Sequence, residues 1–325
     1  MKKHFKKLLL MALMAVMAVG LIACGTDKSD NESTKEEKTS VTITSLDSSK
    51  NEIELEVPYN PKRIAILDLA SLDIIDELGV GDRVVGMAST SIDYLEKYSN
   101  DSSIKNLGTI KEADLEAVME CEPDIIFIGG RLSNSYDALS EIAPVVYLAT
   151  DTNEGLVNSV SKNAKTIASI FGMEDKVNLL MSDFGARIDA IKKISSGKTA
   201  LVGMTTSGSF NLLGNDGRCS LIGVEAGFNN LTAAGSTSTH GNETSFETVV
   251  KQNPDYIFVM DRDSAISTAG AKNAKEIVEN ELVKTTDAYK NNHIIYLEHS
   301  NVWYTAEGGI QALDIMLTDL EKGLK

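Results

Sequence analysis

The sequence has few of the residues that build covalent frameworks. Its 325 residues include three cysteines and one tryptophan. Three cysteines exclude a disulfide framework and a cysteine-rich zinc or iron–sulfur centre. We expect Cys121 and Cys219 to be free, buried thiols, although the sequence alone leaves a bridge between them open.

Histidine is also scarce. A site for a bare zinc or manganese ion needs several imidazoles and carboxylates. Beyond residue 23 the chain has only His240, His293 and His299, and it has no histidine-rich loop. We therefore expect no resident metal centre and no intrinsic cofactor.

The sequence also lacks an excess of positive charge and the common catalytic motifs. The chain has 31 Lys and Arg against 47 Asp and Glu, a formal net charge of −16. So acidic a protein repels phosphate backbones, which argues against nucleic-acid binding. No G-x-S-x-G motif occurs, and Gly197-Lys198-Thr199 lacks the earlier glycine of a phosphate-binding loop because position 192 is lysine. An enzyme is therefore the less favoured class.

The N-terminus has the pattern of an export signal. Four lysines lie among the first seven residues, and the uncharged stretch 8–22 follows. Its 15 residues are too few for a membrane span, which needs about 20, and suit a signal-peptide core over 1–23. The sequence Leu-Ile-Ala-Cys ending at Cys24 resembles the lipobox of bacterial lipoproteins, in which the cysteine is lipidated. An uncleaved anchor is the alternative.

The segment after this cysteine has no large apolar side chains to bury. Residues 25–40 contain no apolar side chain larger than that of threonine. They cannot offset the entropy of ordering, so 24–40 is predicted to be a lipidated, flexible tether. We expect an extracytoplasmic protein on the outer face of a cell membrane, of Gram-positive type.

Valine- and isoleucine-rich runs alternate with helical stretches over the remaining chain. Continuous apolar runs indicate strands that are buried on both faces, and hence mostly parallel sheets with helical crossovers. We predict an α/β fold with two lobes, 41–171 and 197–325, each with a central, mostly parallel sheet flanked by helices. The expected strands are 63–67, 84–87, 125–128, 145–148, 199–204, 256–260 and 293–297.

A long helix is predicted between the two lobes. Apolar residues recur at spacings of three and four from 173 to 194, which is a helical pattern. A helix of about 22 residues is about 33 Å long, so one rigid helix over 173–195 could join the lobes. A preceding helix is expected over 154–171 and a final amphipathic helix over 308–325.

One segment of the chain occurs twice. Residues 114–131 (DLEAVMECEPDIIFIGGR) and 245–262 (SFETVVKQNPDYIFVMDR) share seven identical positions at a constant offset of 131 residues. Each copy predicts a short helix, a proline that ends it, and a buried strand. Arg131 and Arg262 then lie just past the carboxyl ends of their strands, the edge at which open α/β sheets bind ligands. The repeat thus predicts one cation at the ligand edge of each lobe.

The order of these features resembles a known family. The lipobox, the tether, PKRIAILD, NLGTIKEADLEAVMECEPDIIFIGGR, the middle helix and PDYIFVMDR resemble the siderophore-binding lipoproteins of iron-uptake ABC transporters. The resemblance covers residues 41–325 and is greatest to the catecholate and petrobactin-type binders. It implies a monomer that captures a ferric siderophore and delivers it to a permease dimer with ATPase subunits. Haem, cobalamin and ferric hydroxamates remain alternative ligands within this fold.

The resemblance implies three arginines in the ligand cleft. They match Arg131, Arg262 and Arg218, the last in the sequence GNDGRCSL. An iron(III) tris-catecholate carries about three negative charges, and guanidinium groups remain charged and donate forked hydrogen bonds. For any single arginine, a surface salt bridge is the alternative.

The resemblance also implies side chains that reach the iron. His240, in the loop GSTSTHGNETS, and Tyr304, in NVWYTAEGG, match a histidine and a tyrosine that bind iron when a siderophore leaves positions open. A solvated histidine is the alternative for His240. Trp303 either packs on a catechol ring or belongs to the core.

Two glutamates of the repeat are implied to dock on the permease. Glu116 and Glu247 occupy equivalent positions near the start of each repeated helix, after the candidate N-caps Asp114 and Ser245. The resemblance implies that each contacts arginines of the permease dimer. A purely structural role, in which each glutamate stabilises its helix dipole, is the alternative.

Overall fold

A computed structural model describes residues 38–234 and 236–325. The predicted signal peptide 1–23, the lipidation site Cys24 and most of the tether 24–40 lie outside these residues. None of the described helices combines the length and the apolar character that a membrane crossing requires.

The N-terminal lobe is built on a sheet of five parallel strands in the order β5-β4-β3-β8-β9. The strands predicted over 63–67, 84–87, 125–128 and 145–148 are confirmed as β3 (Ile64–Ile66), β4 (Val84–Met87), β8 (Ile125–Ile128) and β9 (Val145–Tyr147). Every residue of β8 is buried, as its unbroken apolar run predicts. The other elements are β1 (Ser40–Leu46), β2 (Glu52–Pro58), α1 (Leu69–Glu77), α2 (Glu96–Ser99), β5 (Lys105–Asn106), β6 (Gly108–Thr109), β7 (Glu112–Ala113), α3 (Leu115–Glu120), α4 (Tyr136–Ser140) and α5 (Leu156–Phe171).

The C-terminal lobe has a mixed sheet whose centre is parallel. The strands predicted over 199–204, 256–260 and 293–297 are confirmed as β10 (Thr199–Thr206), β14 (Tyr256–Asp261) and β15 (Ile294–Tyr296). These three pair in parallel, and β12 (Asn229–Asn230) adds a parallel pair to β10. The antiparallel strands are β11 (Ser209–Leu212) and β13 (Asn242–Glu243). The helices are α8 (Ser220–Val224), α9 (Phe246–Gln252), α10 (Arg262–Ala265), α11 (Ala274–Val278), α12 (Asp287–Lys290) and α13 (Ser300–Thr305).

The antiparallel edge arises from a tight hairpin that was not predicted. Ser207 and Gly208 both have positive φ, 51° and 80°, and they join β10 to β11 as a two-residue loop. Such a loop needs positive φ at both positions, and its twist matches that of the flanking strands. It extends β10 two residues beyond the predicted end and turns the chain back along the same sheet.

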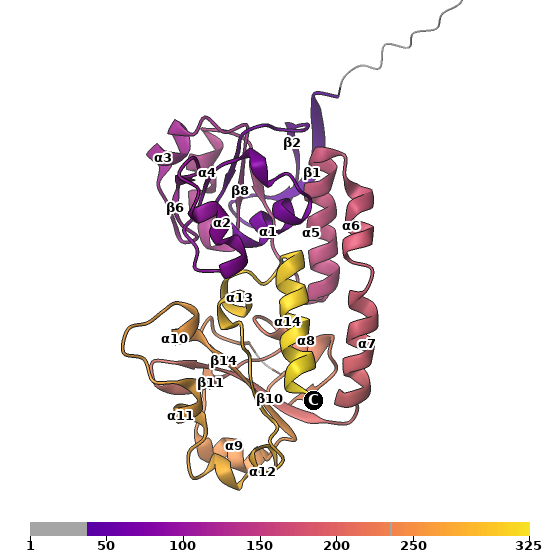
Figure 1. The fold of residues 1–325 in the computed structure, drawn as a ribbon, viewed down its shortest axis with the longest axis vertical. Coiled ribbons are helices and arrows are strands. Elements are labelled where there is room, and N and C mark those ends of the chain that lie inside the picture. Colours follow the sequence, from indigo (N-terminus) through magenta and orange to yellow (C-terminus); the bar gives the residue numbers. More distant parts are fainter. Residues whose placement is uncertain (1–37, 235) are drawn as a thin grey trace, which may run out of the picture. The chain divides into compact units, whose positions relative to one another are not determined.

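The connection between the lobes differs from the prediction of one helix over 173–195. After α5 ends at Gly172, which has a φ of 66°, the chain forms two helices, α6 (Glu174–Leu180) and α7 (Phe184–Ser195) (Figure 1). The hydroxyl of Ser182 donates to the carbonyl of Leu179 at 2.8 Å in the break. Serine and aspartate favour such local bonds over helix interiors, so Ser182-Asp183 interrupts the helix. The helical spacing of apolar residues continues through this break because α6 and α7 both pack on the same hydrophobic core.

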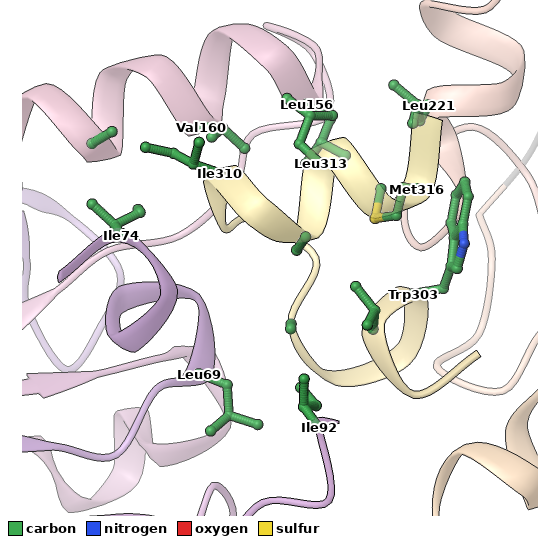
Figure 2. Close-up of a cluster of buried hydrophobic side chains, with 14 of the residues drawn as sticks. Leu69, Ile74, Ile92, Leu156, Val160, Leu221, Trp303, Ile310, Leu313 and Met316 are labelled. Atoms are coloured by element: carbon green, nitrogen blue, oxygen red, sulfur yellow. The ribbon is translucent and has the colours of Figure 1, made fainter. Parts of the chain in front are cut away.

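The last helix also joins the lobes. The helix predicted over 308–325 is confirmed as α14 (Ile310–Gly323), and it packs on α1 and α5 as well as on α7 and α13. In Figure 2, Ile310 lies near Val160 of α5, Leu313 lies near Leu156 of the same helix, and Met316 lies near Trp303. The core therefore runs without interruption from one lobe into the other.

Two helices that start at the lobe boundary are capped by carboxylates of the opposite lobe. Asp73 of α1 accepts hydrogen bonds from the amides of Gln311 and Ala312, each at 2.9 Å, in the first turn of α14. Glu225, which follows α8, accepts from the amide of Val157 at 2.6 Å in the first turn of α5. Burial raises the pKa of Asp73 to about 6 and also raises the pKa of Glu225. The two caps tie each lobe to a helix of the other.

Candidate functional site

A cavity of about 550 Å³ lies where the two lobes meet. Its N-terminal wall includes residues within two positions of the ends of β3, β8 and β9, so it lies at the carboxyl ends of three parallel strands. Its C-terminal wall comes from residues around α8 and α13. The volume falls within the range typical of small-molecule sites. Among the residues that line it are Asp68, Gly129, Arg131, Leu148, Thr150, Leu156, Asp216, Arg218, Thr239, Tyr304 and Glu307.

The three arginines predicted for the cleft converge on one side chain, Tyr304. The guanidinium carbons of Arg131, Arg218 and Arg262 lie 5.9, 4.5 and 5.9 Å from the centre of its ring. Arg131 donates to the Tyr304 carbonyl at 3.2 Å, and Arg218 donates to the same oxygen at 3.3 Å. Arg131 comes from the N-terminal lobe and the other two from the C-terminal lobe. The predicted convergence is therefore present, although Arg262 is not among the residues that line the cavity.

These cations perturb one another and the tyrosine. Burial and the charge of Arg218 lower the pKa of Arg131. Arg262 has a raised pKa because it interacts with the Tyr304 hydroxyl and with Asp263, whose carboxylate is 3.0 Å away. Burial acts to raise the pKa of Tyr304, but the interaction with Arg262 and the nearby cationic charges lower it overall. A phenolate is a good iron(III) ligand, so this environment favours the chemistry expected of Tyr304.

His240 lies in an exposed loop near the same cluster. Its carbonyl accepts a hydrogen bond from the Asn211 side chain at 2.8 Å. Its pKa is lowered by burial and by the charges of Arg262, Arg218 and Lys111. The charge of Lys111, in the β6–β7 hairpin, also acts on Tyr304. Lys111 is a further cation that the sequence analysis missed, although it lies within the quoted motif NLGTIKEADLE.

Two of the carboxylates that line the cavity have raised pKa values, and the sequence did not single out either. Asp68 caps α1, accepting from the amide and the hydroxyl of Ser71 at 2.9 and 2.8 Å, and burial raises its pKa. Glu307 accepts from the amide of Cys219 at 3.2 Å, and burial raises its pKa to about 7. Asp151 and Asp216 line the cavity as well, and both are exposed, so the cavity combines a cluster of cations with four acids.

Trp303 does not line the cavity, so of its two expected roles the contact with a catechol ring is wrong. Its side chain is fully buried among the hydrophobic side chains of Figure 2. Its Nε1 donates to Asp319 at 3.0 Å. Consecutive residues of a helix point about 100° apart, so α13 can direct Tyr304 to the cavity only by directing Trp303 elsewhere. The core alternative is the correct one for this residue.

Glu116 and Glu247 are exposed at the second position of α3 and α9. The predicted caps are present: Asp114 accepts from the amide of Ala117 at 3.0 Å, and Ser245 from that of Thr248 at 3.3 Å. The two lobes thus present equivalent acidic helix starts, while their role in docking stays a prediction. The two cysteines of the described chain, 121 and 219, are free and buried, as expected.

The chain is similar to binding proteins of known specificity. A family model for periplasmic binding proteins matches residues 64–300. The petrobactin-binding protein YclQ of Bacillus subtilis is 36% identical over 330 residues, covering 98% of this chain and 99% of the relative. Its crystal structure matches with a TM-score of 0.80, covering 88% of this chain and 99% of the other.

Two further relatives come from Vibrio species. The structure of the periplasmic catecholate-siderophore-binding protein VctP of Vibrio cholerae is 30% identical, with a TM-score of 0.78 and coverage of 87% of this chain and 100% of the other. The ferric-anguibactin-binding protein FatB of Vibrio anguillarum is 26% identical over 273 residues, covering 82% of this chain and 84% of the relative.

Proposed function

The chain belongs to the periplasmic binding protein family, and we propose that it captures a ferric siderophore of the catecholate class for iron uptake. The family consists of binding proteins and not of enzymes. The convergence of three arginines from both lobes on Tyr304 is the observation that carries the proposal. Relatives that bind petrobactin, catecholate siderophores and ferric anguibactin support it.

The charge of the site favours a strongly anionic ligand. An iron(III) tris-catecholate has a charge of about −3, and a neutral ferric hydroxamate has none for the arginines to compensate. The overall protein is acidic, so the three arginines around Tyr304 form a local cluster of positive charge that attracts an anion. Binding is non-covalent, and the ligand leaves unchanged.

Tyr304 and His240 supply iron ligands when the siderophore leaves coordination positions open. The lowered pKa of Tyr304 favours its phenolate, and the exposed loop of His240 lies close to the arginines. Tyr304→Phe and His240→Ala should therefore weaken binding of tetradentate ferric complexes and change binding of hexadentate ones little. A ligand-to-metal absorption band of the tetradentate complex that persists in both variants would contradict direct coordination.

Delivery and anchoring complete the proposal. Glu116 and Glu247 would dock on the permease dimer, whose ATPase subunits supply the energy for transport. Cys24 would carry the lipid that holds the protein outside the membrane. Replacing Cys24 should release the protein from the membrane fraction, and retention of the variant there would indicate an uncleaved anchor.

A ligand panel tests the proposed function. Quenching of the Trp303 fluorescence should be measured with a ferric tris-catecholate, ferric petrobactin, a ferric hydroxamate, haem and cobalamin. We expect the catecholate complexes to bind at least tenfold more tightly than the others. Equal or tighter binding of the hydroxamate, haem or cobalamin would overturn the assignment of ligand class.

A further inference from the structure

Glu307 is a cavity residue that the attraction of an anionic ligand does not explain. It follows α13 and precedes α14, on the segment that leads from Tyr304 to the helix shared by both lobes. The charges of Arg218 and Arg131 both act on it. A carboxylate at this point opposes the binding of the anion that its neighbouring arginines attract.

The second cavity acid with a raised pKa has a structural explanation. Asp68 accepts two hydrogen bonds from Ser71 and thereby caps α1. Among the hydrogen bonds of residues 38–234 and 236–325, the Glu307 carboxyl group accepts one, to Oε1, from the amide of Cys219, the N-cap residue of α8. Its second oxygen can therefore take up a proton without loss of that bond.

We propose that Glu307 is a further ligand-recognition residue, whose carboxylate takes up one proton from solvent as the anionic ligand enters and whose new O–H group donates to a ligand oxygen. This inference rests on the proposed function and extends it. A neutral ligand would leave the carboxylate charged and gain no such bond, so Glu307 helps the site to select strongly anionic complexes.

The physical basis is an exchange of counter-charges. Without ligand, the Glu307 carboxylate partly offsets the repulsion between Arg131 and Arg218. A ligand of charge −3 takes over that role and repels the carboxylate, which favours protonation. Because burial already raises the pKa of Glu307 to about 7, protonation costs little near neutral pH. The groups that act on Glu307 are Arg218, Cys219, Glu225 and Arg131. The other titratable groups that line the same cavity are Asp68, Asp151, Asp216 and Tyr304.

Isothermal titration calorimetry tests the proton directly. The full-length protein is titrated with the iron(III) complex of a synthetic hexadentate tris-catecholate, in buffers of low and high ionisation enthalpy, at pH 7.0 and 8.0. A hexadentate probe fills the iron coordination sphere, so Tyr304 releases no phenol proton. We expect uptake of about half a proton at pH 7.0 and close to one at pH 8.0. Kd should rise by up to tenfold between pH 7.5 and 8.5.

Variants assign the proton to its residue. Glu307→Gln should take up less than about a tenth of a proton, and its Kd should depend little on pH. Asp68→Asn is the matched control, because asparagine also caps helices, and it should retain the wild-type proton count.

The outcomes separate the two levels of the proposal. Tight binding without proton uptake by the wild-type protein, or with uptake that persists in Glu307→Gln, would overturn the role of Glu307 and leave the proposed function standing. Absence of binding at both pH values would overturn the proposed function itself, and the role of Glu307 with it. The proton uptake of the wild-type protein is measured without any variant, so this part of the test still applies if a variant does not fold.

Discussion

The two copies of the repeat have the same helix start and strand but place their arginines in different surroundings. In both copies a capped helix precedes a buried strand, and an exposed glutamate occupies the second helical position. Arg131 is followed by Leu132 and donates to a backbone carbonyl of the other lobe. Arg262 is followed by Asp263 and pairs with it at 3.0 Å. The position after the repeat therefore gives Arg262 an acidic partner in its own segment, whereas the acids that act on Arg131, Asp68 and Glu307, come from elsewhere in the chain.

The two arginines therefore have similar positions but differ in how much of their positive charge is free to attract a ligand. The shared sequence brings both arginines to the ring of Tyr304, but Arg262 has a buried acid beside it and Arg131 has none in its own segment. We infer that Arg131 contributes more to the attraction of an anion, and that Arg262 contributes more to the stability of its lobe.

The largest expected effect concerns what the two copies share. Glu116→Ala combined with Glu247→Ala should abolish siderophore-dependent uptake of radiolabelled iron into cells and leave the Kd for the ligand unchanged. A two-point contact loses both acidic groups in this variant. Glu141→Ala with Glu276→Ala removes the same charge from exposed positions and should transport normally. Normal transport by the first pair would refute docking through the repeat.

Arg131→Ala should give the largest loss of binding among the arginines. Removal of a charge-assisted hydrogen bond donor costs about 1–3 kcal/mol, which corresponds to roughly 5- to 150-fold in Kd. Fluorescence titration with the ferric tris-catecholate measures it. Lys62→Ala, at the edge of the sheet opposite the cavity, controls for net charge. An affinity equal to that of the control would remove Arg131 from the site.

Arg262→Ala should weaken binding less than Arg131→Ala and reduce stability more. Asp263 is 4% exposed, and its carboxylate would lose its cationic partner, at a cost of about 1–3 kcal/mol in unfolding free energy. Adding Asp263→Asn should recover part of that stability without recovering affinity. Denaturant unfolding and titration of the single and double variants check both. Equal losses of affinity in Arg131→Ala and Arg262→Ala would erase the contrast between the copies.

The smallest expected effect is a gain in stability. The pKa of Glu307 is raised from 4.5 to about 7, so the folded protein holds an extra proton between these values and loses stability as pH rises through them. Glu307→Gln removes this penalty and should stabilise the ligand-free protein at pH 8 by about 1–2 kcal/mol, with no gain near pH 4.5. Calorimetric unfolding at both pH values measures it. If the stability difference between Glu307→Gln and the wild type is the same at both pH values, burial does not penalise the Glu307 carboxylate.

Local sequence predicted the strands and the repeated arginines because these depend on neighbouring residues. Val/Ile runs specify buried strands, and the repeat specifies where Arg131 and Arg262 leave them. The break at Ser182-Asp183 was missed because apolar spacing continued through it. The cap from Asp73 to Gln311 spans 238 positions in the chain, and Glu307 meets Cys219 across 88. Contacts of this kind have no local pattern, so only the folded chain reveals them.

The reciprocal caps at the lobe boundary make each half of the chain a template for the other. A fragment ending near residue 197 would leave the start of α5 without Glu225, and the complementary fragment would leave the start of α14 without Asp73. Both fragments would also expose apolar surface from the shared core. We therefore expect a single cooperative melting transition for the two lobes, and severed halves that become ordered only when they are mixed.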